Sequence, residues 1–178
     1  MKLAVIGAGV TGITTAYFLR QAGHEVTVID ANPYPAMLAS HANGGQLSAS
    51  NSEVWNSWAN VRKGIAWSLK RDAPLKMRYD LDFAKYKWLI QFMSNIKYAK
   101  ENTMTTTEMA MHSIRIMRTE FEDIEYDRSD CGIMHIYKKE KDYKHAKEMN
   151  KIYKAGGLHR SEITENMIKI KEPRLEAD

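Results

Sequence analysis

Cysteine is nearly absent from the sequence, and this scarcity limits the chemistry that the chain can carry. Cys131 is the one cysteine among 178 residues, so no disulfide can form within the chain. No cluster of cysteine and histidine residues has metal-ligand spacing, and a metal site is therefore not expected. We expect a reducing compartment, with the cytoplasm as the first choice.

Long uninterrupted apolar runs are lacking as well. The nearest candidate, residues 3–19, is interrupted by glycines and is preceded by a single basic residue, Lys2. It therefore predicts neither an export signal nor a membrane-spanning helix. Because 44% of the residues are apolar and 27% are charged, the chain has the composition of a folded globular protein.

The net charge of +4 is unevenly distributed along the chain. Residues 61–100 hold ten lysines and arginines against three aspartates, which gives this segment +7 and leaves −3 for the rest. Such a basic segment with aromatic residues is typical of a surface that binds an anionic membrane or nucleic acid, and also of a solvated helical face with its aromatic residues in the core. No nucleic-acid-binding motif accompanies the charge, so nucleic acid is not an expected partner. The tryptophans lie in or just before this segment: Trp55, Trp58, Trp67 and Trp88.

The first thirty residues have the pattern of a βαβ unit. Two short apolar runs, residues 3–6 and 26–29, are typical of strands that are buried on both faces. Residues 13–21 between them favour a helix that ends near Gly23. The sequence therefore predicts an α/β fold that begins with a Rossmann-like βαβ unit.

Three glycines lie where the first strand turns into this helix, and each needs a bare backbone for its own reason. Gly7 permits the tight turn, Gly9 lets a pyrophosphate approach the backbone, and Gly12 lets the helix pack closely on the strand. The pyrophosphate would lie at the amino end of the helix, beside Val10 and Thr11, where unpaired N–H groups favour negative charge. A glycine-rich turn that binds no ligand is the alternative.

An acidic residue ends the second strand, at the spacing where dinucleotide-binding folds hold the adenosine ribose. We expect Asp30, with the adjacent Ala31, to contact that ribose. A carboxylate there disfavours the 2′-phosphate of NADP. FAD and NAD share the ADP half, so the pattern by itself does not separate them.

The remaining segments show further helix and strand patterns. Apolar residues recur at helical spacing over 83–96 and 110–124, and their methionine and aromatic side chains are expected in the core. Residues 133–137 favour a strand in which His135 faces a neighbouring strand. Residues 140–154 favour a charged helix that ends at two glycines.

The loop after the βαβ unit carries a family resemblance. Residues 38–50 (LASHANGGQLSAS) are small and polar, as expected of a loop that lines a ligand or is mobile. With the first thirty residues, the stretch 40–48 resembles the start of the small subunit of the D-amino acid dehydrogenase family, in the FAD-dependent amino acid oxidase superfamily. Residues 73–75 are similarly specific to that family. The similarity also runs through residues 64–82, 87–93, 131–142 and 168–178.

The resemblance implies that FAD is the cofactor and that the loop lies close to the flavin. The positions that match the family pattern are Ser40, Asn43, Gly44, Gly45 and Gln46. His41 lies in the same contact segment, where the family usually has Phe, and is expected to be a bystander rather than a base. Ala39 and Ala49 also depart from the pattern, which has Thr and Pro there.

The family oxidises a D-amino acid or a related amine to the imino acid and then the keto acid, with hydride transfer to the flavin. The resemblance therefore implies an amino acid substrate, electron transfer to membrane quinones, and peripheral contact with the inner face of the cytoplasmic membrane. It assigns no catalytic side chain within this chain. Two alternatives stay open, an NAD-dependent dehydrogenase and a non-catalytic truncated homologue that acts as an interaction module.

By the same resemblance the chain divides into three parts. Residues 1–50 form the FAD-binding βαβ unit and flavin loop, residues 51–125 a helical, basic and Trp-rich region, and residues 126–178 the start of an α+β substrate domain. Family members are much longer, so a fragment, a truncated product or one half of a split enzyme is expected. An incomplete sheet has an unpaired strand edge and leaves helix faces exposed, which favours a complementing carboxy-terminal chain or self-association.

Overall fold

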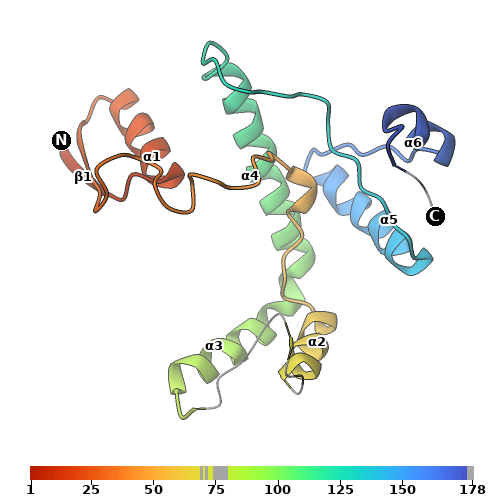
Figure 1. The fold of residues 1–178 in the computed structure, drawn as a ribbon. Helices are drawn as coiled ribbons and strands as arrows, with labels where there is room; N and C mark the ends of the chain where they lie inside the picture. The colour runs from red at the N-terminus through yellow and green to blue at the C-terminus, as the bar shows by residue number, and fades with distance from the viewer. Residues whose placement is uncertain (69, 71, 74–79, 176–178) are drawn as a thin grey trace. The chain divides into compact units, whose positions relative to one another are not determined.

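The computed structural model describes residues 1–68, 70, 72–73 and 80–175, and the chain packs as two units (Figure 1). The amino-terminal unit is Met1–Leu47 and the carboxy-terminal unit is Ser48–Asp178. Most of the family-specific stretch 73–75 lies outside the described residues. The three-part division at residues 50 and 125 stays a prediction.

The amino-terminal unit contains a parallel βαβ arrangement, as the sequence predicts. Its elements are β1 (Lys2–Ile6), α1 (Val10–Gln21) and β2 (Glu25–Ile29). The two strands pair in register, with Ile6 opposite Ile29. The Gly7 N–H then donates to the Ile29 carbonyl at 2.7 Å, which carries the pairing one residue beyond β1. The glycine turn is therefore fixed to the end of β2.

The strands of this unit are more exposed than their sequence predicts. Ile6 is 88% exposed and Ile29 is 53% exposed, whereas the buried apolar residues described in the unit are Ala8 and Ala16. The expectation that both strands are buried on both faces is wrong here, because a single helix covers only one face of a sheet. Apolar residues of α1 are exposed as well, with Val10 at 61% and Phe18 at 41%, as expected for the helix of an incomplete sheet.

The carboxy-terminal unit is mainly helical. Its elements in chain order are η1 (Ala49–Asn51), α2 (Trp58–Ser68), α3 (Phe83–Ser94), η2 (Asn95–Tyr98), α4 (Ala99–Thr119), α5 (Glu140–Ala155) and α6 (Glu165–Lys171). The Asp82 carboxylate caps α3 by accepting from the backbone N–H groups of Ala84 at 2.9 Å and Lys85 at 3.3 Å. The helix predicted over residues 140–154 is confirmed by α5.

Predictions for two further segments of this unit are wrong. Residues 133–137 form no strand, and His135 binds the Ser50 hydroxyl rather than facing a neighbouring strand. A single extended segment needs a partner to become a strand, and the described strands β1 and β2 pair with each other. The second amphipathic helix, α4, ends at Thr119, so Ile124 lies beyond it.

The buried core of the carboxy-terminal unit contains mostly small residues, together with one methionine and one tyrosine. The buried residues described there are Ala49, Thr103, Thr107, Ala146, Met149, Tyr153 and Gly156. The apolar residues of α3 were predicted in the core but are largely exposed, with Phe83 at 84% and Ile90 at 63%. Trp55 is 81% exposed and Trp88 is 58% exposed, so neither anchors a helix to the core. An amphipathic pattern specifies a face to bury but not the element that covers it.

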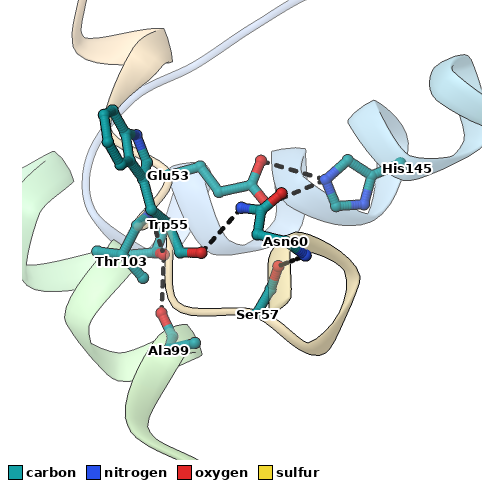
Figure 2. Close-up of polar contacts among 8 residues, drawn as sticks. Glu53, Trp55, Ser57, Asn60, Ala99, Thr103 and His145 are labelled. Carbon is teal, nitrogen blue, oxygen red and sulfur yellow. Dashed lines mark hydrogen bonds and ion pairs between the residues drawn. The ribbon is translucent and has the colours of Figure 1, made fainter. Parts of the chain in front are cut away.

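Hydroxyl groups join α4 to the segment that precedes α2. The Thr107 and Ser52 hydroxyls lie 2.7 Å apart, and the Thr106 hydroxyl donates to the Ser52 carbonyl at 2.8 Å. The Thr103 hydroxyl oxygen accepts from the Val54 N–H at 3.3 Å and donates to the Ala99 carbonyl at 2.7 Å (Figure 2). The buried threonines therefore have partners for their polar atoms.

The helix α5 contacts both the segment that precedes α2 and the helix α4. The Glu53 carboxylate lies 3.0 Å and 3.1 Å from Nε2 of His145 on α5 (Figure 2). At the end of α5, a Cβ on Gly156 would lie 2.7 Å from the Thr107 Cβ and 2.9 Å from the Met104 carbonyl oxygen. Close helix packing therefore needs glycine at this position. None of the helices that the structure describes is both long enough and apolar enough to cross a membrane.

Candidate nucleotide-binding site

The glycine turn between β1 and α1 disfavours side chains at two positions, through the backbone conformation at Gly7 and through close packing at Gly12. Gly7 has φ +96°, in the left-handed region that favours glycine. A Cβ on Gly12 would lie 1.8 Å from the Gly7 carbonyl oxygen and 3.5 Å from Cγ1 of Val5. The roles predicted for these two glycines, a tight turn and close packing of helix on strand, agree with this geometry.

The amino end of α1 has backbone N–H groups that take no part in the helical hydrogen bonds. Gly9 is the residue before the helix and supplies no side-chain cap. The N–H groups of Val10, Thr11 and Gly12 precede the first helical bond, which runs from the Ile13 N–H to the Gly9 carbonyl at 3.0 Å. Such N–H groups and the positive end of the helix dipole attract anions.

Ser40, from the loop of residues 38–50, reaches this helix end. Its hydroxyl oxygen accepts a hydrogen bond from the Val10 N–H at 3.0 Å. A Cβ on Gly9 would lie 3.2 Å from the same oxygen, which is closer than most real Cβ contacts. The bare backbone at Gly9 therefore leaves room for the serine hydroxyl. Ser40 therefore meets Gly9 and Val10, two predicted site residues about 30 positions earlier in the sequence.

Asp30 holds the glycine turn from the other side. Its Oδ2 accepts from the Ala8 N–H at 2.6 Å. Its Oδ1 accepts from the Asn32 backbone N–H at 2.7 Å and side-chain amide at 3.0 Å. The hydrogen bond from Ala8, and then those from Asn32, lower the pKa of the Asp30 carboxyl below its ordinary value. The carboxyl is therefore ionised at neutral pH.

The Asp30 carboxylate keeps room for a further donor. A carboxylate has about four acceptor positions, and three are occupied here. The Ala36 N–H also donates to the Ala8 carbonyl at 2.9 Å, so Ala8 is held through both of its backbone groups. Sequence reasoning missed Asn32 and Ala36. The Asp-x-Asn spacing after β2, which favours a local side-chain turn, was the signal available for Asn32.

The remaining predicted contacts lie in exposed parts of the loop. The Gly45 N–H donates to Oδ1 of Asn43 at 2.7 Å, and Gly45 has φ +62°. Together these features form a local turn. The other members of the predicted set are exposed, and the structure gives them no partner on the glycine turn: Ala31, His41, Gly44 and Gln46. In the part of the chain that is described, no group of histidine, cysteine and acidic side chains could hold a metal ion.

Comparison with known proteins finds a matching family model and several relatives. The model of the family described as FAD dependent oxidoreductase matches residues 2–177. The chain is 45% identical to D-amino acid dehydrogenase 3 of Mesorhizobium japonicum, over 98% of this chain and 43% of that protein. It is 38% identical to D-amino acid dehydrogenase of Rhodopseudomonas palustris, over 79% of this chain and 34% of that protein. No solved structure matches the chain.

A third relative is also matched over less than half of its own length. The chain is 35% identical to D-amino acid dehydrogenase of Paramagnetospirillum magneticum, over 99% of this chain and 43% of that protein. The chain therefore spans less than half the length of the curated relatives that it matches. The family match confirms the predicted resemblance and the preference for FAD as the family's cofactor, and it does not favour the NAD-dependent alternative.

Proposed function

This chain belongs to the FAD-dependent oxidoreductase family, and from that premise we propose that its amino-terminal unit binds the ADP half of FAD. The observation that carries the proposal is the meeting of Gly9, Val10 and Ser40 at the amino end of α1. The residues proposed to hold the pyrophosphate are Gly7, Gly9, Val10, Thr11 and Gly12.

The ribose and the flavin are assigned to the segments that follow. We propose that the Asp30 carboxylate accepts a hydrogen bond from a ribose hydroxyl at its remaining acceptor position. The adjacent Ala31 is proposed to contact the same ribose. The ionised carboxylate would repel a 2′-phosphate, which favours FAD over a phosphorylated dinucleotide. The loop residues proposed to face the flavin are Ser40, His41, Asn43, Gly44, Gly45 and Gln46.

The whole protein is proposed to oxidise a D-amino acid to the imino acid, which hydrolyses to the keto acid and ammonia. Bound FAD would accept the hydride that leaves the α-carbon of the substrate. The residues of this chain bind and orient the cofactor, through the helix end, the Asp30 carboxylate and the loop. No residue of this chain is assigned to binding of the amino acid. We propose that the residues that bind it correspond to the part of the relatives' sequence that this chain does not cover.

The exposed apolar surface of the amino-terminal unit supports a proposal about assembly. Ile6, at 88% exposed, and Ile29, at 53%, are strand residues of the kind that a larger parallel sheet buries. We propose that a further layer of secondary structure covers this face of the sheet, supplied by a complementing carboxy-terminal chain or by self-association. Native mass spectrometry of the purified chain would report the cofactor, the oligomer and any bound partner in one measurement.

The test of FAD binding compares the parent chain with Gly9→Val. We expect the parent to bind FAD and Gly9→Val to lose most of it, because valine needs the space that the Ser40 hydroxyl and the pyrophosphate would occupy. Titration with FAD, followed by flavin fluorescence, measures the difference. Gly64→Ala is the control, since a Cβ there meets nothing within 4 Å. Equal binding by both chains would place the site elsewhere, and no binding by either would refute the cofactor assignment for this chain.

A second proposal is that the exposed tryptophans contact an anionic membrane surface. Trp55 is 81% exposed and Trp58 is 59% exposed, in or next to the basic segment. Aromatic and basic side chains together bind the interface of anionic lipids.

This membrane proposal is tested by sedimentation with phosphatidylserine and phosphatidylcholine vesicles. We expect binding to the anionic vesicles alone, weakened by salt and by the pair Trp55→Ser and Trp58→Ser. Met109→Ser, which replaces a side chain 65% exposed on α4, should leave binding unchanged. Equal sedimentation with both kinds of vesicle, or none with either, would contradict the proposal.

A further inference from the structure

The carboxyl end of α5 and the turn that follows it border a small cavity. Its volume is about 240 Å³, and it lies wholly within the carboxy-terminal unit. Among the described residues no acidic side chain lines it, whereas most of its wall is basic. The lining residues are Asn150, Lys151, Lys154, His159 and Arg160. A cavity of this composition attracts anions.

Two of the cations at this cavity are not neutralised by a neighbouring carboxylate. The Nζ of Lys151 lies 3.0 Å and 3.1 Å from the carboxylate oxygens of Glu148, so its charge is paired. In the part of the chain that the structure describes, neither Lys154 nor Arg160 forms an ion pair. Both of these cations are therefore available to an anion.

Arg160 is held in a fixed position beside the cavity. It is partly buried, and its Nη2 donates to the Tyr137 hydroxyl at 2.9 Å. Its guanidinium also lies 5.4 Å from the centre of the Tyr153 ring. A guanidinium has five N–H donors, so donors remain for a ligand. A cation that is already fixed loses less conformational entropy when it binds an anion.

The backbone at the end of α5 presents few unpaired carbonyl groups to an anion. Unpaired carbonyls at the end of a helix carry partial negative charge and would repel one. Here the carbonyl oxygens of residues 152–154 accept hydrogen bonds from the backbone N–H groups of residues 156–158, at 2.9 to 3.1 Å. The turn therefore reduces this repulsion.

A polar atom on the same cavity wall has no partner. Oδ1 of Asn150 is buried and accepts no hydrogen bond from the residues that the structure describes. Buried acceptors in folded proteins nearly always have a donor. Because the Asn150 side chain lines the cavity, a ligand with an O–H group would supply the missing donor.

We propose that this cavity binds free inorganic phosphate as the monohydrogen dianion. The charged oxygens of the ligand would accept from Lys154 and Arg160, and its O–H group would donate to Oδ1 of Asn150. Sulfate and phosphate monoesters are also dianions above neutral pH, but they carry no O–H group on the anion there. The unpartnered oxygen therefore favours inorganic phosphate over both. All of the residues lie in the carboxy-terminal unit, so the inference does not depend on the proposed binding of FAD.

The experiment is an NMR titration of the full chain at about pH 8, where the three anions have the same charge. The probes are inorganic phosphate, sulfate and methyl phosphate. We expect phosphate to shift the signals of the His159 ring and the Asn150 side-chain amide, which report on this cavity and not on the amino end of α1. The midpoint for phosphate should lie about tenfold below those for sulfate and methyl phosphate.

Substitutions test the residues that would hold the phosphate. Lys154→Gln and Arg160→Gln should each weaken phosphate binding about tenfold, because each removes a charged donor. Asn150→Leu should reduce the affinity for phosphate to that for sulfate, read from the His159 ring. Lys144→Gln is the matched control, since Lys144 is a 73% exposed lysine of α5 that does not line the cavity. Urea unfolding followed by tryptophan fluorescence checks that each variant is folded, because all four tryptophans lie in this unit.

Each contrary outcome removes a different part of the inference. Absence of any shift at His159 and Asn150 would overturn the cavity as an anion site. Equal midpoints for the three anions would overturn the assignment to inorganic phosphate. An equal loss in Lys144→Gln and Lys154→Gln would show general attraction to a basic helix and would overturn the specific site. Gly9→Val should bind phosphate here as the parent does, so failure of the FAD assignment leaves this inference intact.

Discussion

Gly12→Ala is expected to unfold the amino-terminal unit and to abolish FAD binding. The added Cβ would lie 1.8 Å from the Gly7 carbonyl oxygen and 2.9 Å from the Gly7 carbonyl carbon. Both are backbone atoms of the turn, so no side-chain rotation can relieve the overlap. Overpacking of this kind costs about 3 kcal/mol or more, which exceeds the gain of about 1 kcal/mol from replacing glycine by alanine in a helix.

The distribution of tryptophan makes this prediction measurable within a single chain. All four tryptophans lie between residues 55 and 88, in the carboxy-terminal unit. We therefore expect Gly12→Ala to leave the urea unfolding curve from tryptophan fluorescence unchanged, while the amides of β1 and β2 lose their protection from hydrogen exchange. Gly64→Ala, which meets nothing within 4 Å, should preserve that protection. Protected amides in Gly12→Ala would contradict the tight packing of the turn.

The βαβ unit was predictable because its determinants are local. The positions of Gly7 and Gly12 encode a left-handed turn and a close contact between neighbouring elements, and both can be recognised from spacing within a few residues. The meeting of Ser40 with Val10 was less accessible. The family resemblance implied that the loop lies close to the cofactor, but it did not indicate the hydrogen bond to Val10, which depends on how the loop folds back.

The errors have a different origin, because they concern the partners that an element packs against. The α3 pattern is amphipathic, but Phe83 and Ile90 are largely exposed. Residues 133–137 have the composition of a strand but no strand to pair with in the described part of the chain. Periodicity identifies the face that an element can bury, while the covering element is set by the rest of the fold.

The hydrogen bonds of Asp30 and His135 also show that a sequence pattern does not specify the partner of a residue. Asp30 was predicted as a ribose ligand from its place after β2, but its bond to Ala8 depends on the shape of the turn. No sequence pattern indicates the contact between His135 and Ser50, which joins segments 85 residues apart. Long-range polar contacts of this kind require the fold to be known.

Asp30→Asn is expected to weaken FAD binding about 10- to 100-fold. An amide has one acceptor oxygen, whereas the carboxylate accepts from Ala8 on one oxygen and from Asn32 on the other. The asparagine NH₂ group would therefore face a backbone N–H, and the turn would lose a charge-assisted bond. ADP should lose the same factor as FAD, because the ribose contact lies in the shared half of the molecule, and FMN binding should be unaffected.

Asn32→Ala separates the role of the carboxylate from that of its neighbour. This variant removes the side-chain bond to Oδ1 but keeps the backbone N–H bond of residue 32 and the bond from Ala8. We expect FAD binding to weaken less than about threefold. The pKa of Asp30 is lowered, so the stabilisation that its ionised form gives to the turn is present above the ordinary pKa and is lost as pH falls through the lowered one. Calorimetric titrations with FAD and ADP at several pH values should show this acid step in the parent and in Asn32→Ala but not in Asp30→Asn. Equal affinities for Asp30→Asn and the parent would mean that the carboxylate contributes to neither the turn nor the ribose.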